Sequence, residues 1–290
     1  MDLFQALILG LVQGITEYIP VSSSAHLGLV PWLLGWSGIS FAFYVLVQWG
    51  TLVGVFIFFW QDIWNITKSV IQGLLQGRPL ATFEAKLGWL VVVATIPAVV
   101  LGLLFKDFFE ATFSAPLIDG SFLIVNALIL AGAEFYSSAA TITNEADASG
   151  TITKEKKGWR GLPSLNWLDA TIIGLWQAVA ILPAISRSGA TISGAMLRGF
   201  DRTSAARFSF LMSIPALVGA GLVALKDLFE AGTFTAELPA ISVGFVAAAI
   251  SGYICIRWLL HYLQRHSLYI FAAYCLAFGI MIIIVALIRG

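Results

Sequence analysis

The chain has 290 residues, of which 59% are hydrophobic and 11% are charged, and its formal net charge is zero. Soluble domains contain about 25% charged residues, so this composition, with a mean hydropathy of +0.91, excludes an ordinary soluble domain and indicates a protein that crosses a membrane several times. A neutral chain gives no reason to expect a nucleic acid as partner, and an acidic residue near the start, where a signal peptide would be basic, predicts no cleavable signal.

Six stretches are long enough to span a bilayer, which requires about 20 apolar residues. They cover approximately residues 41–60, 86–105, 117–136, 207–225, 238–260 and 268–288. Two other apolar regions, 3–35 and 166–199, are interrupted by Pro20 and Pro183, each followed by serines. Their halves are too short to span, so we expect two re-entrant helix pairs. Turns at membrane depth are tolerated where they are buried in protein or line a wet cavity.

Two short matches indicate an internal duplication. ALILGLVQ at 6–13 resembles ATIIGLWQ at 170–177, and FYVLVQWGTLVG at 43–54 resembles FSFLMSIPALVG at 208–219. The two pairs are separated by nearly the same number of residues, 164 and 165. Chance similarity between apolar segments is the alternative explanation, but it does not predict a shared spacing.

One copy would contain a re-entrant pair and three spans, which is an odd number of crossings, so the second copy has to be inverted in the membrane. We therefore expect an all-α polytopic membrane domain with six transmembrane helices and two re-entrant pairs in an inverted-topology repeat. Its parts would be a first repeat at 1–136, a polar cytoplasmic connector at 137–165 and a second repeat at 166–290.

The distribution of basic residues agrees with this topology. We place the N-terminus outside, so that the segments 61–85, 137–165, 199–206 and 261–267 are cytoplasmic loops. That side then holds twelve lysines and arginines, whereas the outer side holds only Lys106, Lys226 and Arg289. This is the asymmetry that the positive-inside rule requires. The sixteenth basic residue, Arg187, belongs to neither side.

The two breaks carry different polar residues. The first reads QGITEYIPVSSSAH, from Gln13 to His26, and the second reads QAVAILPAISRSGAT, from Gln177 to Thr191. One has an acid and a histidine, and the other has an arginine and a threonine. Because inverted repeats with broken helices place their sites near the midplane, where the breaks meet, we expect one composite site.

Arg187 indicates an anion site. A charged side chain at the bilayer centre costs at least about 2.5–3.5 kcal/mol, so something must compensate. One interpretation is an ion pair with Glu17 that holds the halves together. The other is a phosphate, whose oxygens match the guanidinium fork. Serines that open helices favour the phosphate, because helix N-termini bind anions. The candidate phosphate-binding side chains are Ser22, Ser24, Ser186, Ser188, Thr191 and Gln13.

The candidate catalytic residues are Glu17, Ser23, His26 and Arg187. Glu17 lies one turn after Gln13 on the same helix face and could be a general base, a metal ligand or an orienter of His26. Histidine suits proton transfer near neutral pH, although a histidine bonded at a helix interface is an equally good interpretation. An adjacent base would activate Ser23 as a nucleophile.

No resident cofactor is expected, because one histidine and one carboxylate do not form a closed metal site. The alternative is a Mg²⁺ or Ca²⁺ ion that bridges substrate phosphates and Glu17.

QGITEYIPVSSSAH and PAISRSGAT together resemble the motifs of the undecaprenyl-diphosphate phosphatase family, which is associated with bacitracin resistance. IPAVVLGLLF, FSFLMSIP and GATISGAML are also typical of it. The resemblance implies six spans and two re-entrant pairs in inverted repeat. It also implies hydrolysis of a C55 isoprenyl diphosphate at the outer face of the plasma membrane, which recycles the monophosphate carrier for cell-wall synthesis. The motif positions are matched by Glu17, Ser23, His26, Ser186, Arg187, Ser188 and Thr191.

Two departures from the family pattern affect the mechanism. Gln13 stands where many members have glutamate, which puts a two-carboxylate metal site in doubt. Ala184 replaces a glycine, so a turn with positive φ there would be strained. The attacking group stays open between Ser23, a phospho-histidine at His26 and an activated water.

The alternative function is a lipid-phosphate transporter or flippase that uses the same inverted-repeat anion site. A purely structural subunit leaves Arg187 unexplained. The sequence does not determine the oligomeric state, and a homodimer is one of the alternatives.

Overall fold

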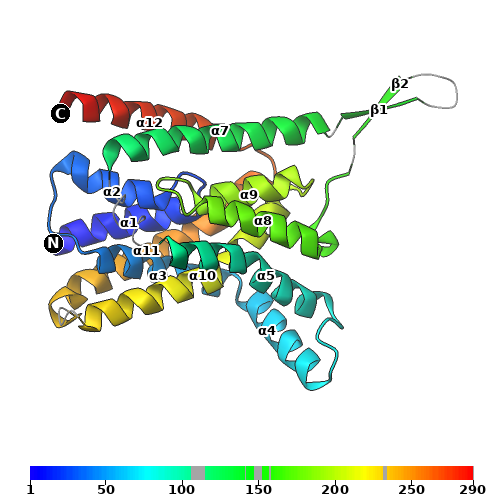
Figure 1. Ribbon diagram of the computed structural model, residues 1–290, viewed down its shortest axis with the longest axis horizontal. Helices are drawn as coiled ribbons and strands as arrows, with labels where there is room; N and C mark the ends of the chain where they lie inside the picture. Colours follow the sequence, from blue (N-terminus) through cyan, green and yellow to red (C-terminus); the bar gives the residue numbers. More distant parts are fainter. Residues whose placement is uncertain (106–114, 141, 147–151, 157, 231–233, 290) are drawn as a thin grey trace.

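The computed structural model describes residues 1–105, 115–140, 142–146, 152–156, 158–230 and 234–289. Within these ranges the protein is a bundle of roughly parallel helices, and a small strand hairpin projects from one end (Figure 1). Both termini lie at the opposite end of the bundle (Figure 1). The predicted fold class, a helical protein with several membrane spans, is confirmed.

Six of the described helices are long and apolar enough to cross a membrane, and they coincide with the six predicted spans. They are α3 (Phe41–Phe58), α5 (Phe83–Leu104), α7 (Pro116–Ala140), α10 (Arg202–Glu230), α11 (Phe234–Leu263) and α12 (Tyr269–Arg289). Large apolar side chains remain exposed along their outer faces, for example Ile284, Leu287 and Ile288 on α12. Such a surface is unfavourable in water and suits the hydrocarbon of a bilayer.

The two interrupted regions form two helix hairpins. The first consists of α1 (Leu3–Tyr18) and α2 (Ser23–Leu34), and the second of α8 (Trp167–Val179) and α9 (Arg187–Leu197). Each is too short to span a bilayer, as expected. The first hairpin opens toward the end of the bundle that holds the termini, and the second opens toward the strand end (Figure 1). Their turns are therefore brought together inside the bundle.

The caps of these hairpins repeat at one spacing. Asp2 and Asn166 each cap the first helix of a hairpin with a capping box, and Ser22 and Ser186 each cap the second. Both pairs are 164 residues apart, the spacing of the first sequence match. An N-cap side chain satisfies backbone N–H groups that the helix leaves free, so the sequence defines where each of these helices begins.

The segment 61–85 was expected to be a loop, and this expectation is wrong. Helix α4 (Trp60–Leu75) occupies most of it and projects from the bundle beside α5 (Figure 1). Ile66 and Val70, one helical turn apart with polar residues between them, lie directly over Gly88 of α5, while Trp64, Leu74 and Leu75 remain exposed. The polar residues hide this helical periodicity when only continuous apolar runs are sought.

The connector at 137–165 also contains regular structure that was not predicted. Helix α7 continues to Ala140, and the strands β1 (Ile142–Ala146) and β2 (Ile152–Lys156) pair in antiparallel register, with Ile142 opposite Lys156. A 3₁₀ turn follows at Leu162–Ser164. Both strands begin with the β-branched residues Ile and Thr, which are favoured in strands. The chain is therefore helical apart from this pair of short strands in the part that the structure describes.

Glycines allow each hairpin to approach the other half of the chain closely. Helix α1 packs on α11, and helix α8 packs on α5. A Cβ atom at Gly10 would lie 2.3 Å from the carbonyl oxygen of Gly244, and one at Gly174 would lie 2.5 Å from that of Ala94. Gly10 and Gly174 are partners in the first sequence match, and each permits a close helix contact in its own hairpin.

Candidate active site at the two helix breaks

Asn126 of α7 connects the two breaks. Its side-chain amide donates to the carbonyl oxygen of Pro20 in the first break at 3.1 Å, and its Oδ1 accepts from the backbone N–H of Ser186 in the second at 3.1 Å. The N-termini of α2 and α9 therefore lie close together, as the composite-site hypothesis requires. Each break also contains a non-glycine residue with positive φ, Ser22 at 71° and Ala184 at 54°. The strain expected at Ala184 is thus present.

Glu17 is the centre of the polar network. Its Oε1 forms an ion pair with Arg187, while its Oε2 accepts from the Ser23 hydroxyl at 2.5 Å and from Gln13 Nε2 at 2.7 Å. The ion pair joins the first break to the second. The Glu17 side chain is only 5% exposed, but that of Arg187 is 20% exposed. Among the described residues the guanidinium has no other hydrogen-bond partner, so several of its N–H groups are available to an anion.

Four serine hydroxyls line the two helix starts in matching pairs. The Ser22 and Ser24 hydroxyls are 3.2 Å apart, and those of Ser186 and Ser188 are 3.0 Å apart. Ser22 and Ser186 also cap α2 and α9. Two helix N-termini, each with a partial positive charge and free N–H groups, converge here. This arrangement can bind phosphate oxygens.

His26 points away from the proposed nucleophile. Its Nδ1 lies 2.7 Å from the carbonyl oxygen of Ser22, and its Nε2 lies 2.7 Å from the hydroxyl of Tyr274. A carbonyl only accepts, so Nδ1 carries a proton, and Nε2 of the neutral ring then accepts from the tyrosine. The ring also stacks on Phe278, with centroids 4.8 Å apart. Of the two candidate bases, Glu17 and not His26 forms a hydrogen bond with Ser23.

Thr191 and Gln13 have surroundings different from those of the serines. The Thr191 hydroxyl donates to the Arg187 carbonyl at 2.8 Å and lies 2.6 Å from the Ser209 hydroxyl of α10. It is fully buried, and its hydrogen bond to the Arg187 carbonyl stabilises the first turn of α9. Gln13 donates to Glu17, but its Oε1 is buried without a hydrogen-bond partner. An amide in this place orients Glu17 without adding a second negative charge.

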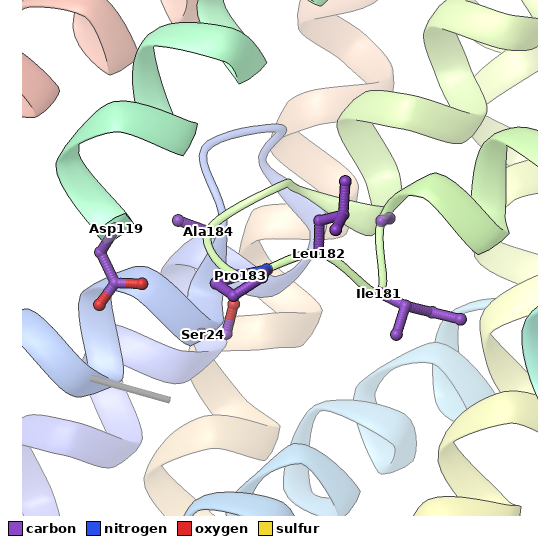
Figure 2. A pocket seen from close by; sticks show the side chains of 7 residues that line it. Ser24, Asp119, Ile181, Leu182, Pro183 and Ala184 are labelled. Atoms are coloured by element: carbon purple, nitrogen blue, oxygen red, sulfur yellow. The ribbon is translucent and has the colours of Figure 1, made fainter. Parts of the chain in front are cut away.

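An open pocket borders the network. It is lined by Ser24 at the start of α2, by Asp119 in the first turn of α7, and by the turn 180–184 that precedes α9 (Figure 2). Sequence reasoning missed Asp119, Asn126 and Tyr274. All three are polar groups within predicted spans, where polar side chains are costly and commonly functional, and that signal could have found them.

Metal binding by Glu17 has little support in the geometry. Both of its carboxylate oxygens are already engaged by Arg187, Ser23 and Gln13. Within the described ranges no three or more histidine, cysteine, aspartate or glutamate side chains come together in a way that could hold a metal ion. A cation at this site would depend on oxygen atoms from elsewhere, such as substrate phosphates.

Comparison with protein families matches residues 6–281 to the family described as bacitracin resistance protein BacA. The chain belongs to this family. The match to the BacA family includes both helix breaks and every residue of the network described above. The likeness therefore extends over nearly the whole chain and is not confined to two short motifs.

Relatives of this BacA-family chain carry the name undecaprenyl-diphosphatase. The protein of Chlorobaculum tepidum is 44% identical over 287 residues, which cover 98% of this chain and 97% of the relative. Those of Chloroherpeton thalassium and Pelodictyon phaeoclathratiforme are each 42% identical, over 287 and 285 residues, and cover 98% of this chain and 96% of the relative.

Proposed function

We propose that the protein is an integral membrane phosphatase that hydrolyses undecaprenyl diphosphate to undecaprenyl phosphate and inorganic phosphate. The observation that carries this proposal is the contact between Ser23 and Glu17 beside Arg187, at the point where two helix N-termini meet. A nucleophile, a base and an anion-binding group are thus within reach of one phosphate. The family membership and the names of the relatives support the same substrate. Removal of the diphosphate form of the lipid would account for bacitracin resistance.

Phosphate binding would use Arg187 and the two helix starts. The hydroxyls of Ser22, Ser24, Ser186 and Ser188 and the free backbone N–H groups would surround the phosphate oxygens. Arg187, which is now paired with Glu17, would turn its free N–H groups to the substrate. Donors placed in this way stabilise the charge that develops on the equatorial oxygens in the transition state.

The proposed reaction begins with attack of Ser23 Oγ on the terminal phosphorus. An oxygen–phosphorus bond forms, the bond from that phosphorus to the bridging oxygen breaks, and undecaprenyl phosphate leaves as the anion. Glu17 receives the serine proton over the 2.5 Å hydrogen bond. Water then attacks the phosphorus of the phosphoserine, and the bond from that phosphorus to Ser23 Oγ breaks. Glu17 returns its proton to Oγ, which regenerates Ser23, and both protons of the water stay on inorganic phosphate as it leaves.

The nucleophile is identified by trapping the phosphorylated enzyme and mapping the labelled residue. A phosphorylated enzyme with the label on Ser23 would support this route, and label on His26 would replace it with a phospho-histidine. An unlabelled enzyme would favour direct attack by a water that Glu17 activates.

We also propose that the chain lies in the plasma membrane with its site open to the outer side. In the topology derived from the sequence, twelve basic residues fall on the side of the segment 61–85 and the connector, and three fall on the side of the N-terminus. The opposite directions of the two helix hairpins and the common spacing of their caps support re-entrant pairs in an inverted repeat. The repeats would cover 1–136 and 166–290, with the connector at 137–165 on the cytoplasmic side.

The deciding experiment measures phosphate release from undecaprenyl diphosphate by purified protein. We expect release by the wild type and its loss in Arg187→Ala, while Arg265→Ala, at an exposed position, keeps it. The same preparation gives the oligomeric state, including whether a homodimer forms. A folded wild type that moves labelled lipid across vesicles but releases no phosphate, with or without Mg²⁺, would support a flippase instead.

A further inference from the structure

Tyr274 of α12 reaches the site through His26. Its hydroxyl lies 2.7 Å from Nε2 of the imidazole, and Nδ1 on the other side of the ring lies 2.7 Å from the carbonyl oxygen of Ser22. His26 is only 5% exposed, so both ring contacts are shielded from bulk water. Only one neutral form satisfies both of them, with the proton on Nδ1 and the lone pair of Nε2 facing the tyrosine hydroxyl. Tyr274 therefore sets the tautomer of His26.

The carbonyl that His26 holds belongs to the peptide unit between Ser22 and Ser23. Ser22 has a positive φ of 71°, a conformation that a residue with a side chain keeps only when its surroundings fix it. The same carbonyl accepts from the backbone N–H of His26 at 3.3 Å, so one residue holds it with both its backbone and its ring. Because a peptide unit is planar and trans, fixing this carbonyl also fixes the direction of the Ser23 N–H and the point from which the Ser23 hydroxyl reaches Glu17.

Helix α12 is a rigid support for this contact. It packs closely along α7 (Figure 1), where a Cβ atom at Gly279 would lie 2.7 Å from the carbonyl oxygen of Gly120. Near its end, Arg289 donates to two carbonyl oxygens in the last turn of α2, at 2.8 and 3.0 Å. Helix α12 thus contacts α2 at both of its ends, which keeps the Tyr274 hydroxyl at a defined place. Reacting groups are held accurately when their supporting side chains lie on such elements.

In the proposed reaction Glu17 takes the proton of Ser23, so His26 and Tyr274 carry out no chemical step. We propose that Tyr274 is a positioning residue for the hydrolysis: through the His26 ring it fixes the peptide unit that precedes Ser23 and so aims the Ser23 hydroxyl at the terminal phosphorus. This inference rests on the proposed function and deepens it. Without the tyrosine hydroxyl, the ring proton can move from Nδ1 to Nε2, and a lone pair then faces the Ser22 carbonyl.

The first test removes the hydroxyl alone. Tyr274→Phe keeps the ring that stacks beside His26 and Phe278, but it leaves Nε2 without a donor. We expect kcat for phosphate release from undecaprenyl diphosphate to fall about tenfold, as for a small misplacement of a reacting group, and KM to change little because the phosphate-binding groups remain. Tyr136→Phe, which removes the hydroxyl of an exposed side chain, should change neither. A lower melting temperature with an unchanged kcat would show that Tyr274 only stabilises the fold, and would overturn the proposal.

Substitutions of His26 separate positioning from proton transfer. The amide nitrogen of an asparagine takes the place of Nδ1 and always carries its protons, whereas a glutamine places its amide near Nε2. His26→Asn should therefore keep most of kcat, while His26→Gln and His26→Ala should lose about 100-fold. Tyr274→Phe should have no further effect in a His26→Asn background, because the tyrosine acts through the ring. If His26→Asn were as inactive as His26→Ala, the ring itself would move protons or accept the phosphoryl group, and the proposal would be overturned.

A spectroscopic readout does not depend on hydrolysis. The chain has three histidines, and His261→Gln with His266→Gln, both at exposed positions, leaves His26 as the only imidazole in ¹⁵N NMR. We expect this ring to carry its proton on Nδ1, and we expect Tyr274→Phe to shift the Nε2 signal while Tyr136→Phe does not. A proton on Nε2 in the presence of Tyr274 would overturn the proposal. The expected spectrum in a folded protein that releases no phosphate would overturn only the proposed function.

Discussion

At the scale of single residues, the proposed chemistry depends on the contact between Ser23 and Glu17. Glu17→Gln keeps the size of the side chain and its capacity to hydrogen-bond, but it removes the base. We expect kcat for phosphate release to fall by about 10²–10⁴-fold, with little change in KM because the phosphate-binding groups remain. Steady-state kinetics on undecaprenyl diphosphate checks this. A large rise in KM with an unchanged kcat would assign Glu17 to binding and would leave Ser23 without a base.

Asn126 has a positioning role, because its amide bonds to the backbone of both breaks. Asn126→Leu would leave the Ser186 N–H buried without a partner, at a cost of about 1–3 kcal/mol, and would leave the Pro20 carbonyl with only the weak Cys275 Sγ donor at 3.8 Å. We expect a lower melting temperature together with a lower kcat. Thermal unfolding and phosphate release are measured on the same samples, with Asn65→Leu on the exposed face of α4 as the control. An unchanged kcat in a destabilised protein would show that Asn126 stabilises the fold but does not position the site.

The sequence predicted some of these residue contacts and missed others for a physical reason. Glu17 and Gln13 were paired correctly because helix geometry fixes neighbours four residues apart. The direction of His26 toward Tyr274, and the bridge made by Asn126, depend on contacts between segments more than one hundred residues apart. Periodicity within one segment carries no information about such contacts.

At the scale of helices, the close packing of α8 on α5 depends on Gly174. Gly174→Ala would place a methyl group 2.5 Å from the Ala94 carbonyl oxygen, so α8 and α5 would have to separate. We expect a loss of about 1–3 kcal/mol, typical of overpacking, seen as a lower melting temperature. Gly219→Ala, whose added methyl meets nothing within 4 Å, is the control and should be neutral or stabilising. Equal melting temperatures for the two variants would contradict the packing argument.

Helix α4 shows where reading the sequence by apolar runs fails. The six spans and both hairpins could be predicted because long apolar stretches, prolines and capping serines are local signals. In α4 the apolar residues alternate with polar ones at helical spacing, and the segment was mistaken for a loop. The strands β1 and β2 were missed likewise, since a polar composition was taken to mean an irregular connector.

At the scale of the whole molecule, the proposed orientation predicts which surfaces are reachable from outside the cell. In a background without the native cysteines, Ser37→Cys between α2 and α3 should react with a membrane-impermeant maleimide in intact cells. Gln76→Cys, after α4, should react only after permeabilisation. Both positions are exposed, so accessibility depends on the side of the membrane. Labelling of Gln76→Cys in intact cells would reverse the orientation and place α4 outside.

The connector is held to the second hairpin by Asp169, which lies at the end of the bundle that carries the strands. Its carboxylate binds Arg160 at the end of the connector and Arg198 after α9. Burial alone raises the pKa of this carboxyl, but the hydrogen bonds and charges of the two arginines outweigh it, so the pKa lies below its ordinary value. A lowered pKa means that the folded protein binds this proton less readily than the unfolded chain.

The stabilisation from Asp169 should therefore be complete above the ordinary aspartate pKa of about 3.9. It should be lost as the pH falls through the lower value of the folded protein. We expect Asp169→Asn to melt at a lower temperature than the wild type at pH 7, and the gap between them to narrow as the pH falls below about 4. Melting curves of both proteins across this range test it, with Asp62→Asn as the control for an exposed ion pair. A gap that stays constant or widens in acid would show that Asp169 contributes through packing, and that its charge does not hold the connector to the hairpin.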